Sequence, residues 1–267
     1  MDAPTPKTDQ AADEKKKEPA VTAEAQSKCQ SIWRNHLRPI LILVLVFTSF
    51  RSVVADWNDV PTGSMRPNII EGDRIFVNKL AYSLKVPYTA WHLKWWGAPK
   101  RGDVVVFYEP ESGTRLVKRV VGIPGDRIEV REDRLIINGK EVEYANAPVE
   151  VRRALPENDD AKNKVQREFE FFVEQLDGRP HPVMIDPVPH REPGRRRNVR
   201  PFTVKEGWFY VMGDNRDNSR DSRFFQTDEN GCIPIDRIVG RASRTIFSLD
   251  YNDNYLPRGD RWFRKLP

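Results

Sequence analysis

Cysteine is scarce in this 267-residue chain, which has only Cys29 and Cys232. Two isolated cysteines cannot build a structural zinc site. If the hydrophobic segment between them crosses a membrane, they cannot form an intrachain disulfide either, so we expect Cys232 to be a free thiol packed as a small apolar side chain. The sequence also has no HExxH, GxSxG, Walker-type loop or CxxC. It therefore predicts no metal site and no cofactor.

Histidine is also rare, and this limits the choice of a catalytic base. Three of the four histidines lie in the basic flank or in a proline-rich region, and a Ser–His–Asp triad would have to use His92, which is not at the end of a predicted strand. A hydrolase without an available histidine or metal needs another base, and lysine is the usual substitute.

Charged residues make up 31% of the chain and the net charge is +5, with much of the basic excess in Arg191–Arg200. Such a run can bind nucleic acid or anionic lipid headgroups, but it is more often a solvated loop. No RNA-binding aromatic signature, zinc finger or heptad repeat accompanies it. We therefore expect no nucleic-acid partner.

One segment is strongly hydrophobic. It begins at Pro39 (PILILVLVFTSF) and continues past Arg51 to Ala55, about 25 Å as a helix and at the short end of the range for a membrane span. We expect a retained transmembrane anchor over residues 37–55. A cleavable signal peptide and a buried core helix are alternatives, although the polar region before the segment is far longer than in a usual signal peptide.

The flanks of this segment predict its orientation. Basic residues precede it and acidic residues follow it, so the positive-inside rule places the N-terminus in the cytoplasm and the rest of the chain outside. Residues 1–36 are polar and are expected to form a disordered cytoplasmic tail. The flanking charges are Lys28, Arg34, Arg38, Asp56 and Asp59.

The chain beyond the anchor has the pattern of a mostly β protein with an antiparallel sheet. Short runs rich in β-branched and aromatic residues are bounded by turn residues, and Asn138-Gly139 predicts a hairpin turn. We expect a catalytic core from residues 56–142 and 206–267, with an inserted, charged and proline-rich cap at 143–205 that contains a short helix near Asp160–Leu176. The predicted strands are Asp73–Asn78, Asp103–Tyr108, Leu116–Val121, Arg127–Val130, Leu135–Ile137 and Gly207–Met212.

A serine with a glycine before it lies close to the anchor. Ser64 is in Pro61–Pro67 (PTGSMRP), where Gly63 would let the backbone turn sharply and let a substrate carbonyl approach. Ser64 is nine residues after Ala55, hence within about 30 Å of the membrane surface. Taken alone, a Gly-Ser turn beside an anchor is more often a linker.

A lysine lies in the strand-like run LVKRVVGIPGD. If this run is a strand, Lys118 shares a face with Leu116 and Val120, while Arg119 points to the other face. Burial among aliphatic side chains would lower the pKa of Lys118, as a general base near neutral pH requires. By itself, an exposed lysine is the commoner interpretation.

A third stretch, Gly213–Arg223 (GDNRDNSRDSR), follows a predicted strand. A calcium loop is a poor interpretation, because the EF-hand positions are missing and the interleaved arginines would repel a cation. A network of Arg–Asp pairs explains the composition better.

With these three stretches in this order, the chain resembles the bacterial type I signal peptidases, a family of serine peptidases with a Ser–Lys dyad. The segment around Ser64 resembles the family's nucleophile segment, KRVVGIPGD from Lys118 resembles its base segment, and Gly213–Arg223 matches its terminal box almost residue for residue. Arg101–Val105 matches the strand before the base. The resemblance runs from the anchor to about residue 245.

The resemblance implies a role for each matched residue. Ser64 would attack the scissile carbonyl after giving its proton to neutral Lys118, with an oxyanion hole made by the Ser64 backbone N–H and the Thr62 hydroxyl. Ser219 would orient the Lys118 amine. Gly213 and Asp214 would support the base from behind, while Asp221 and Arg223 would form a structural ion pair.

The resemblance also implies the setting. The substrates would be secretory preproteins with small residues at −1 and −3, cleaved through an acyl-enzyme at the outer face of the inner membrane. Membrane lipid is an expected partner, and the aromatic run AWHLKWW could lie among headgroups or pack in a core. Self-cleaving repressors share the base chemistry but need an N-terminal DNA-binding helix pair. A non-catalytic, membrane-tethered module of the same fold remains the alternative.

Overall fold

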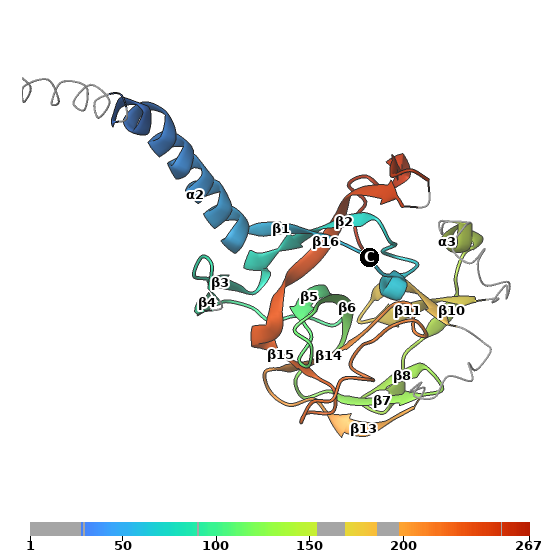
Figure 1. The fold of residues 1–267 in the computed structure, drawn as a ribbon. Helices are drawn as coiled ribbons and strands as arrows, with labels where there is room; N and C mark the ends of the chain where they lie inside the picture. Colours follow the sequence, from blue (N-terminus) through green and yellow to red (C-terminus); the bar gives the residue numbers. More distant parts are fainter. Residues whose placement is uncertain (1–27, 29, 90, 154–168, 186–197, 252) are drawn as a thin grey trace, which may run out of the picture. The chain divides into compact units, whose positions relative to one another are not determined.

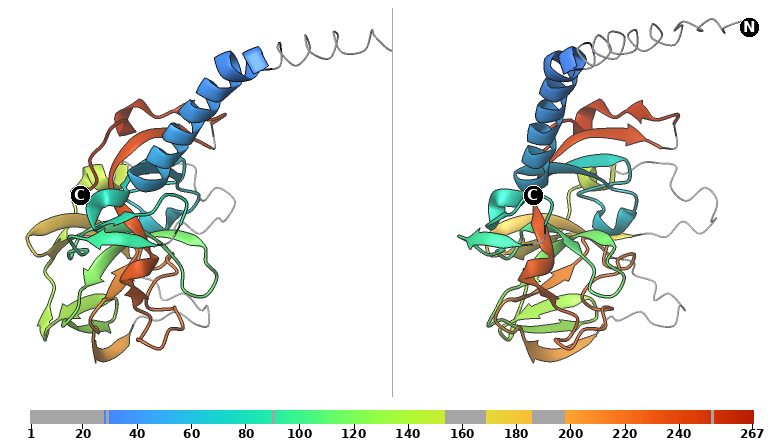
Figure 2. Two further views of the ribbon diagram at one scale, coloured as in Figure 1. Left: turned by 90° about the vertical axis from the view of Figure 1, so that its left-hand side faces the viewer. Right: turned by 60° about the vertical axis from the view of Figure 1, so that its left-hand side comes forward.

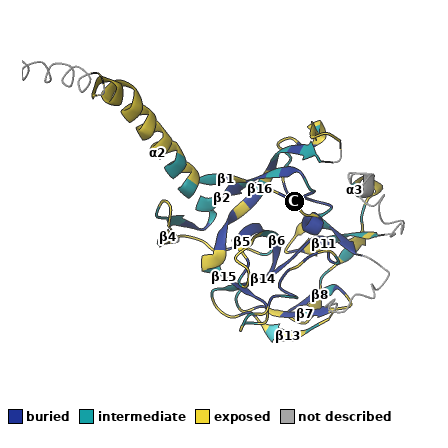
Figure 3. Cartoon of the chain, in the orientation of Figure 1, coloured by how far each residue is buried: buried dark blue, intermediate teal, exposed yellow. Residues whose placement is uncertain are grey.

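The computed structural model describes residues 28, 30–89, 91–153, 169–185, 198–251 and 253–267 (Figure 1). The chain divides after Phe50 into two units, which are described separately. In the first, η1 (Trp33–Leu37) leads into α2 (Arg38–Val53), and none of the residues of α2 is buried (Figure 3). The helical stretch Gln30–Val53 is long and apolar enough to cross a membrane, with a mean hydropathy of 1.5.

The second unit is built on an antiparallel sheet in the order β1-β2-β16-β5-β6-β14-β15, with β17 paired to β16. The long β16 lies between β2 and β5, so a strand near the C-terminus joins two strands from the first half of the chain (Figures 1 and 2). The strands are β1 (Ala55–Asp59), β2 (Asp73–Asn78), β5 (Val104–Tyr108), β6 (Arg115–Gly122), β14 (Trp208–Met212), β15 (Ile233–Pro234), β16 (Ile238–Asp250) and β17 (Leu256–Pro257).

Smaller sheets and turns complete this unit within the described residues. The sheet β13-β7-β8-β9 contains Val199–Thr203, Arg127–Arg131, Arg134–Ile137 and Lys140–Glu141. The sheet β10-β11-β12 contains Tyr144–Asn146, Glu170–Leu176 and Arg179–Ile185, and the pair β3-β4 contains Ser83–Lys85 and His92–Trp95. The short helices are α3 (Val149–Arg153), η2 (Gly63–Met65), η3 (Lys79–Ala81), η4 (Ile235–Arg237) and η5 (Gly259–Arg261).

The mostly β fold with an antiparallel sheet is confirmed, and all six predicted strands are present within one or two residues of their expected ends. The predicted hairpin turn is confirmed too: Asn138 and Gly139 both have positive φ and join Ile137 to its partner Lys140. The prediction of a helix near Asp160–Leu176 is wrong for Glu170–Leu176, because these residues form the strand β11. Residues 154–168 lie outside the described part of the chain.

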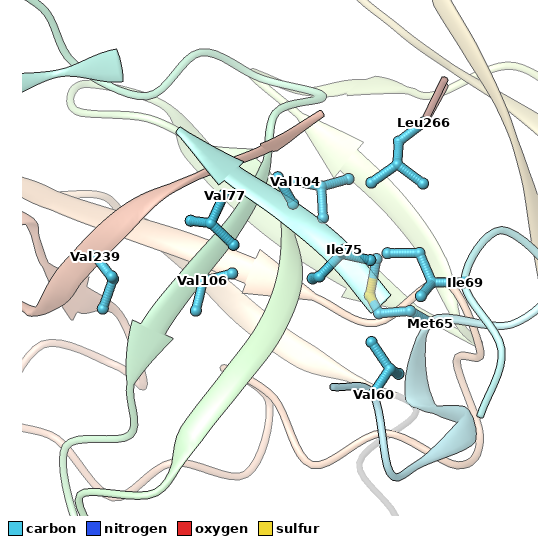
Figure 4. Close-up of a cluster of buried hydrophobic side chains, with 10 residues drawn as sticks. Val60, Met65, Ile69, Ile75, Val77, Val104, Val106, Val239 and Leu266 are labelled. Carbon is cyan, nitrogen blue, oxygen red and sulfur yellow. The ribbon is translucent and has the colours of Figure 1, made fainter. Parts of the chain in front are cut away.

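Three buried apolar clusters hold the sheets together. One cluster lies under the turn that carries Ser64 and includes Val60, Met65 and Ile69 (Figure 4). A second contains Val105, Phe107 and Val120 from β5 and β6. A third contains Cys232, which is buried as expected, and burial raises the pKa of its thiol to about 12. Cys29 lies outside the described residues.

The stretch interpreted as an inserted cap contributes to more than one sheet. Its β13 pairs with β7, and its β12 forms a bridge at Met184 to Asn215, beside the Gly213–Arg223 stretch. Arg191–Arg197 of the basic run lies outside the described residues, and Arg200 is an exposed residue of β13. The predicted anchor is slightly long, because α2 ends at Val53 and Ala55 begins β1.

The aromatic run does not pack in a core. Trp91 is 77% exposed and Leu93 is 65% exposed, on or beside β4. His92 stacks on Trp95 with 4.1 Å between the ring centroids and hydrogen-bonds to Ser83, so it takes part in local packing.

Candidate active site

Ser64 lies in a tight 3-10 turn directly after the extended residue Thr62. The turn is fixed because its next residue, Met65, is buried in the apolar cluster of Figure 4. Gly63 does not have a positive φ; instead, a Cβ there would lie 2.5 Å from Glu71 and 2.8 Å from Arg66, two side chains joined by an ion pair. A side chain at 63 would therefore have to displace the Arg66–Glu71 pair, while the turn itself needs no positive φ.

Lys118 comes to Ser64 from β6. It is 2% exposed, its strand partner is Val105, and its Nζ lies 2.7 Å from the Ser64 Oγ and 3.0 Å from the Val117 carbonyl oxygen. Burial penalises the ammonium form and lowers the pKa of Lys118 to about 8, although nearby carboxylates act in the opposite direction. A substantial fraction of this amine is neutral near pH 8 and can accept the proton of a serine hydroxyl.

Arg119, the next residue, points to the other face of β6. Its Nε and Nη2 each donate to one oxygen of Asp214 at 2.8 Å, and both side chains are buried. Asn68 also donates to Asp214, at 2.6 Å. The resemblance implies that Asp214 supports Lys118 from behind; its side-chain oxygens accept from Arg119 and Asn68, and its charge opposes the lowering of the Lys118 pKa.

The Gly213–Arg223 loop is tied together by the Asp221–Arg223 pair. Asp221 accepts from the Gly213 N–H at 2.9 Å and from both Nε and Nη2 of Arg223 at 2.9 Å. Burial alone would raise the pKa of Asp221, but the Arg223 charge and these hydrogen bonds hold it below its usual range. Asp221 and Arg223, the ion pair that the resemblance implies, are thus joined in the structure.

Gly213 lies where the loop meets the serine turn. A Cβ on Gly213 would lie 2.2 Å from the Ser219 Oγ and 2.5 Å from the Ser64 carbonyl oxygen, so only glycine lets both approach. The Ser219 hydroxyl is buried, and among the described residues no hydrogen bond joins it to Lys118. Ser219 is therefore beside the site without making the direct contact that its implied role requires.

Thr62 is the most open of the predicted site residues. Its side chain is exposed and makes no capping hydrogen bond to the turn that follows. Its side chain is therefore accessible to solvent at the start of the serine turn.

Asn215 is a residue that the sequence did not single out by itself. Its backbone N–H donates to the Ser64 carbonyl at 3.1 Å, and its side-chain amide donates to the Gly63 carbonyl at 3.1 Å. These bonds fix the serine turn against the loop. Composition gives no signal for such contacts, because they depend on two segments about 150 residues apart.

The buried group Glu174, His181 and Arg216 was also missed. Glu174 accepts from Arg216 at 2.6 Å and lies 3.0 Å from His181, and these contacts hold β11 and β12 against the loop. Glu174 lies in the stretch predicted to contain a helix, and a helix prediction does not indicate that its side chain is buried on a strand, β11.

This site combines a serine hydroxyl with a buried lysine amine, the requirements for acyl transfer without a histidine or metal.

The model of the family "Signal peptidase, peptidase S26" matches residues 33–247. The chain is 35% identical over 212 residues to signal peptidase I of Pseudomonas aeruginosa, covering 76% of this chain and 68% of that one. It is 30% identical over 233 residues to signal peptidase I of Rickettsia canadensis, with coverage of 81% and 79%.

A solved signal peptidase I from Enterococcus faecalis aligns with 54% of this chain and 97% of its own, at 27% identity and a TM-score of 0.29, too low to support an argument about the fold. The sequence matches are sufficient: the protein is a serine endopeptidase. The chain belongs to the S26 family of signal peptidases, whose activity is the removal of signal peptides.

Proposed function

We propose that the chain is a membrane-anchored endopeptidase that removes signal peptides from secretory preproteins, with Ser64 as nucleophile and Lys118 as general base. The observation that supports it most is the 2.7 Å hydrogen bond between Lys118 Nζ and Ser64 Oγ, made by an amine whose pKa burial lowers to about 8. Neutral Lys118 takes the Ser64 proton as the hydroxyl oxygen attacks the scissile carbonyl.

The tetrahedral intermediate is stabilised by the backbone N–H of Ser64 and the hydroxyl of Thr62, which lies free of the turn that it precedes. Collapse releases the mature protein's amine, protonated by Lys118, and leaves an ester on Ser64. Water activated by Lys118 then hydrolyses this ester and frees the signal peptide.

An open strand edge beside Lys118 supports a substrate bound in extended form. β14 pairs with β6 only at Arg119–Gly122, so Arg115–Lys118 has a neighbouring strand on its β5 side alone among the described strands. An extended peptide can add to such an edge through its backbone and place alternate side chains in pockets. Small residues at −1 and −3 would fit this alternation.

The membrane setting is supported by the helical stretch Gln30–Val53 and by the exposed aromatic side chains near β4. Tryptophan favours the membrane–water interface. The Tyr88 N–H donates to the Ser52 hydroxyl at 2.9 Å, so within the second unit the β3–β4 loop contacts the residues just before β1. We propose a single-pass protein of the inner membrane with a cytoplasmic N-terminus, the catalytic unit on the outer side and lipid as a partner.

The test is processing of a purified preprotein by the wild type beside Ser64→Ala, with N-terminal sequencing of the product. We expect cleavage after a small residue, lost in the variant, and a rate that falls about tenfold per pH unit below pH 8. Normal processing by Ser64→Ala would refute the mechanism. Absence of processing by the wild type would favour the alternative, a non-catalytic membrane-tethered module.

A further inference from the structure

The turn between β5 and β6 is joined to the loop after Ser219 by two carboxylates. Glu109, which is 4% exposed, accepts from Arg220 Nε at 2.5 Å, and Glu111 accepts from Arg220 Nη2 at 2.7 Å. The second oxygen of Glu111 accepts from the backbone N–H of Gln226 at 2.5 Å. A single guanidinium therefore connects the turn to the loop, and it comes from the residue next to Ser219.

Glu109 is on the side of the sheet that carries Lys118. Val105 and Lys118 are cross-strand partners, and side chains alternate along β5, so residues 105, 107 and 109 share the face of Lys118. The two charges are close enough to interact: Glu109 opposes the lowering of the Lys118 pKa, and Lys118 contributes to lowering the pKa of Glu109. Burial alone would raise the pKa of Glu109, but hydrogen bonds from Ser112 and Arg220 outweigh it.

The carboxylates that act on Lys118 belong to ion pairs. The three carboxylates that act most strongly on Lys118 each form an ion pair with an arginine, and one of these arginines, Arg220, also binds Glu111. Two of these pairs are completely buried, whereas the third lies at the rim, with 55% of the Arg220 side chain exposed. The pairs are Asp214–Arg119, Asp221–Arg223 and Glu109–Arg220.

We propose that the Glu109–Arg220 ion pair is a positioning element for Lys118: Arg220 holds the Glu109 carboxylate in place and offsets its charge, so that Glu109 acts less strongly on the amine. This proposal rests on the function proposed above, because it concerns the same base. Glu109 and Arg220 do not touch the reacting atoms; they act through the proton affinity of Lys118.

The proposal predicts shifts of opposite sign for the two partners. Glu109→Gln removes a negative charge, makes the ammonium less favourable and moves the acid limb of the rate profile to lower pH. Arg220→Ala leaves Glu109, still ionised near pH 8, without its counter-charge and moves the limb to higher pH. Each shift is expected to be about 0.5–1 pH unit. A pair that merely held the loop in place would lower the rate in both variants without opposite shifts.

The experiment measures pH profiles of preprotein cleavage for the full chain and for Glu109→Gln, Arg220→Ala and Lys205→Ala. Lys205→Ala is the matched control, because it breaks another ion pair with an exposed cation, Lys205–Glu229, and it should not shift the profile. Shifts in the same direction, or none, in the first two variants would overturn the proposal.

A second readout separates this proposal from the proposed function. In a Ser64→Cys, Cys29→Ser background, the pH midpoint for alkylation by iodoacetamide reports the charge around residue 64 without any peptidase activity. Cys232 contributes little, because it is buried and its pKa is raised to about 12. Glu109→Gln should lower this midpoint and Arg220→Ala should raise it. Opposite shifts of the alkylation midpoint, with no preprotein cleavage by the wild type, would refute the proposed function alone. Unchanged midpoints in both variants would refute this inference.

Discussion

Lys118 and Arg119 are adjacent cations on β6 that point to opposite faces and are equally inaccessible, at 2% and 1% exposure. Arg119 makes a two-bond pair with Asp214 and donates to the carbonyl oxygens of Gly102 and Pro267. Lys118 donates to a hydroxyl and a carbonyl, with no carboxylate in contact among the described residues.

This difference separates a structural cation from a reactive one. A guanidinium remains charged in proteins, so a buried arginine requires a full set of acceptors. A lysine without an ion-pair partner can respond to burial by releasing its proton. The same strand thus stabilises the fold on one face and carries the proposed base on the other.

The largest expected effect comes from replacing Lys118 by arginine, so that both faces of β6 carry a permanent cation. Lys118→Arg keeps a cation beside Ser64 but removes a group that can be neutral, since the pKa of arginine exceeds 12. Preprotein cleavage should fall on the order of 10⁴-fold or more. Arg131→Ala, which breaks an exposed ion pair with Glu129, should retain full activity. Substantial activity in Lys118→Arg at any pH would show that Lys118 is not the base.

The second effect concerns Arg119, whose face of β6 carries the ion pair with Asp214. Arg119→Met leaves Asp214 buried without its main partner, which should lower the free energy of unfolding by about 3–5 kcal/mol. Urea denaturation followed by far-UV circular dichroism measures this. A loss below about 1 kcal/mol, the size of a surface ion pair, would mean that the two faces do not differ in this way.

The third effect has the opposite sign and concerns Lys118. Below pH 8 the folded protein carries a buried ammonium ion, so Lys118→Met should raise the free energy of unfolding by on the order of 1–3 kcal/mol while abolishing activity.

The pH dependence of this gain follows from the lowered pKa of Lys118. Between about pH 8 and 10 the unfolded chain binds more protons than the folded one, so the wild type gains stability as pH rises. The advantage of Lys118→Met should therefore shrink over that range. A constant difference from pH 7 to 10 would contradict the lowered pKa.

Much of the sheet could be predicted, because period-two alternation and turn residues are local signals. Asn138-Gly139 is an example, since Asn and Gly are the residue types that favour the positive φ angles of a tight hairpin turn. The face shared by Lys118, Leu116 and Val120 followed from alternation as well, and the structure places Leu116 and Val120 in one apolar cluster.

The rest depends on contacts between distant segments. Glu174 falls in the stretch predicted to contain a short helix, but pairing with β12 and the bond from Arg216 make Glu170–Leu176 a strand on which Glu174 is buried. The ion pair between Glu109 and Arg220 is equally invisible, because these two residues are 111 positions apart in the sequence. Catalytic roles for Ser64, Thr62 and Ser219 remain predictions that only activity measurements test.

The smallest expected effect concerns Ser219, on the Lys118 side of the comparison. The structure shows no direct hydrogen bond from Ser219 to Lys118. Ser219→Ala should therefore slow the catalytic step by about tenfold, the size of one neutral hydrogen bond formed during the reaction, and leave KM unchanged.

Ser222→Ala is the matched control for this variant. Ser222 is also buried, but its hydroxyl accepts from the Val211 N–H, so its removal should reduce stability and spare the turnover rate. If Ser219→Ala instead slowed turnover by about a thousandfold or more at unchanged stability, Ser219 would have to contact the amine directly during catalysis. Lys118 would then have a third hydrogen-bond partner beside Ser64 and Val117, and its contrast with Arg119 would lie in the charge of the partners alone.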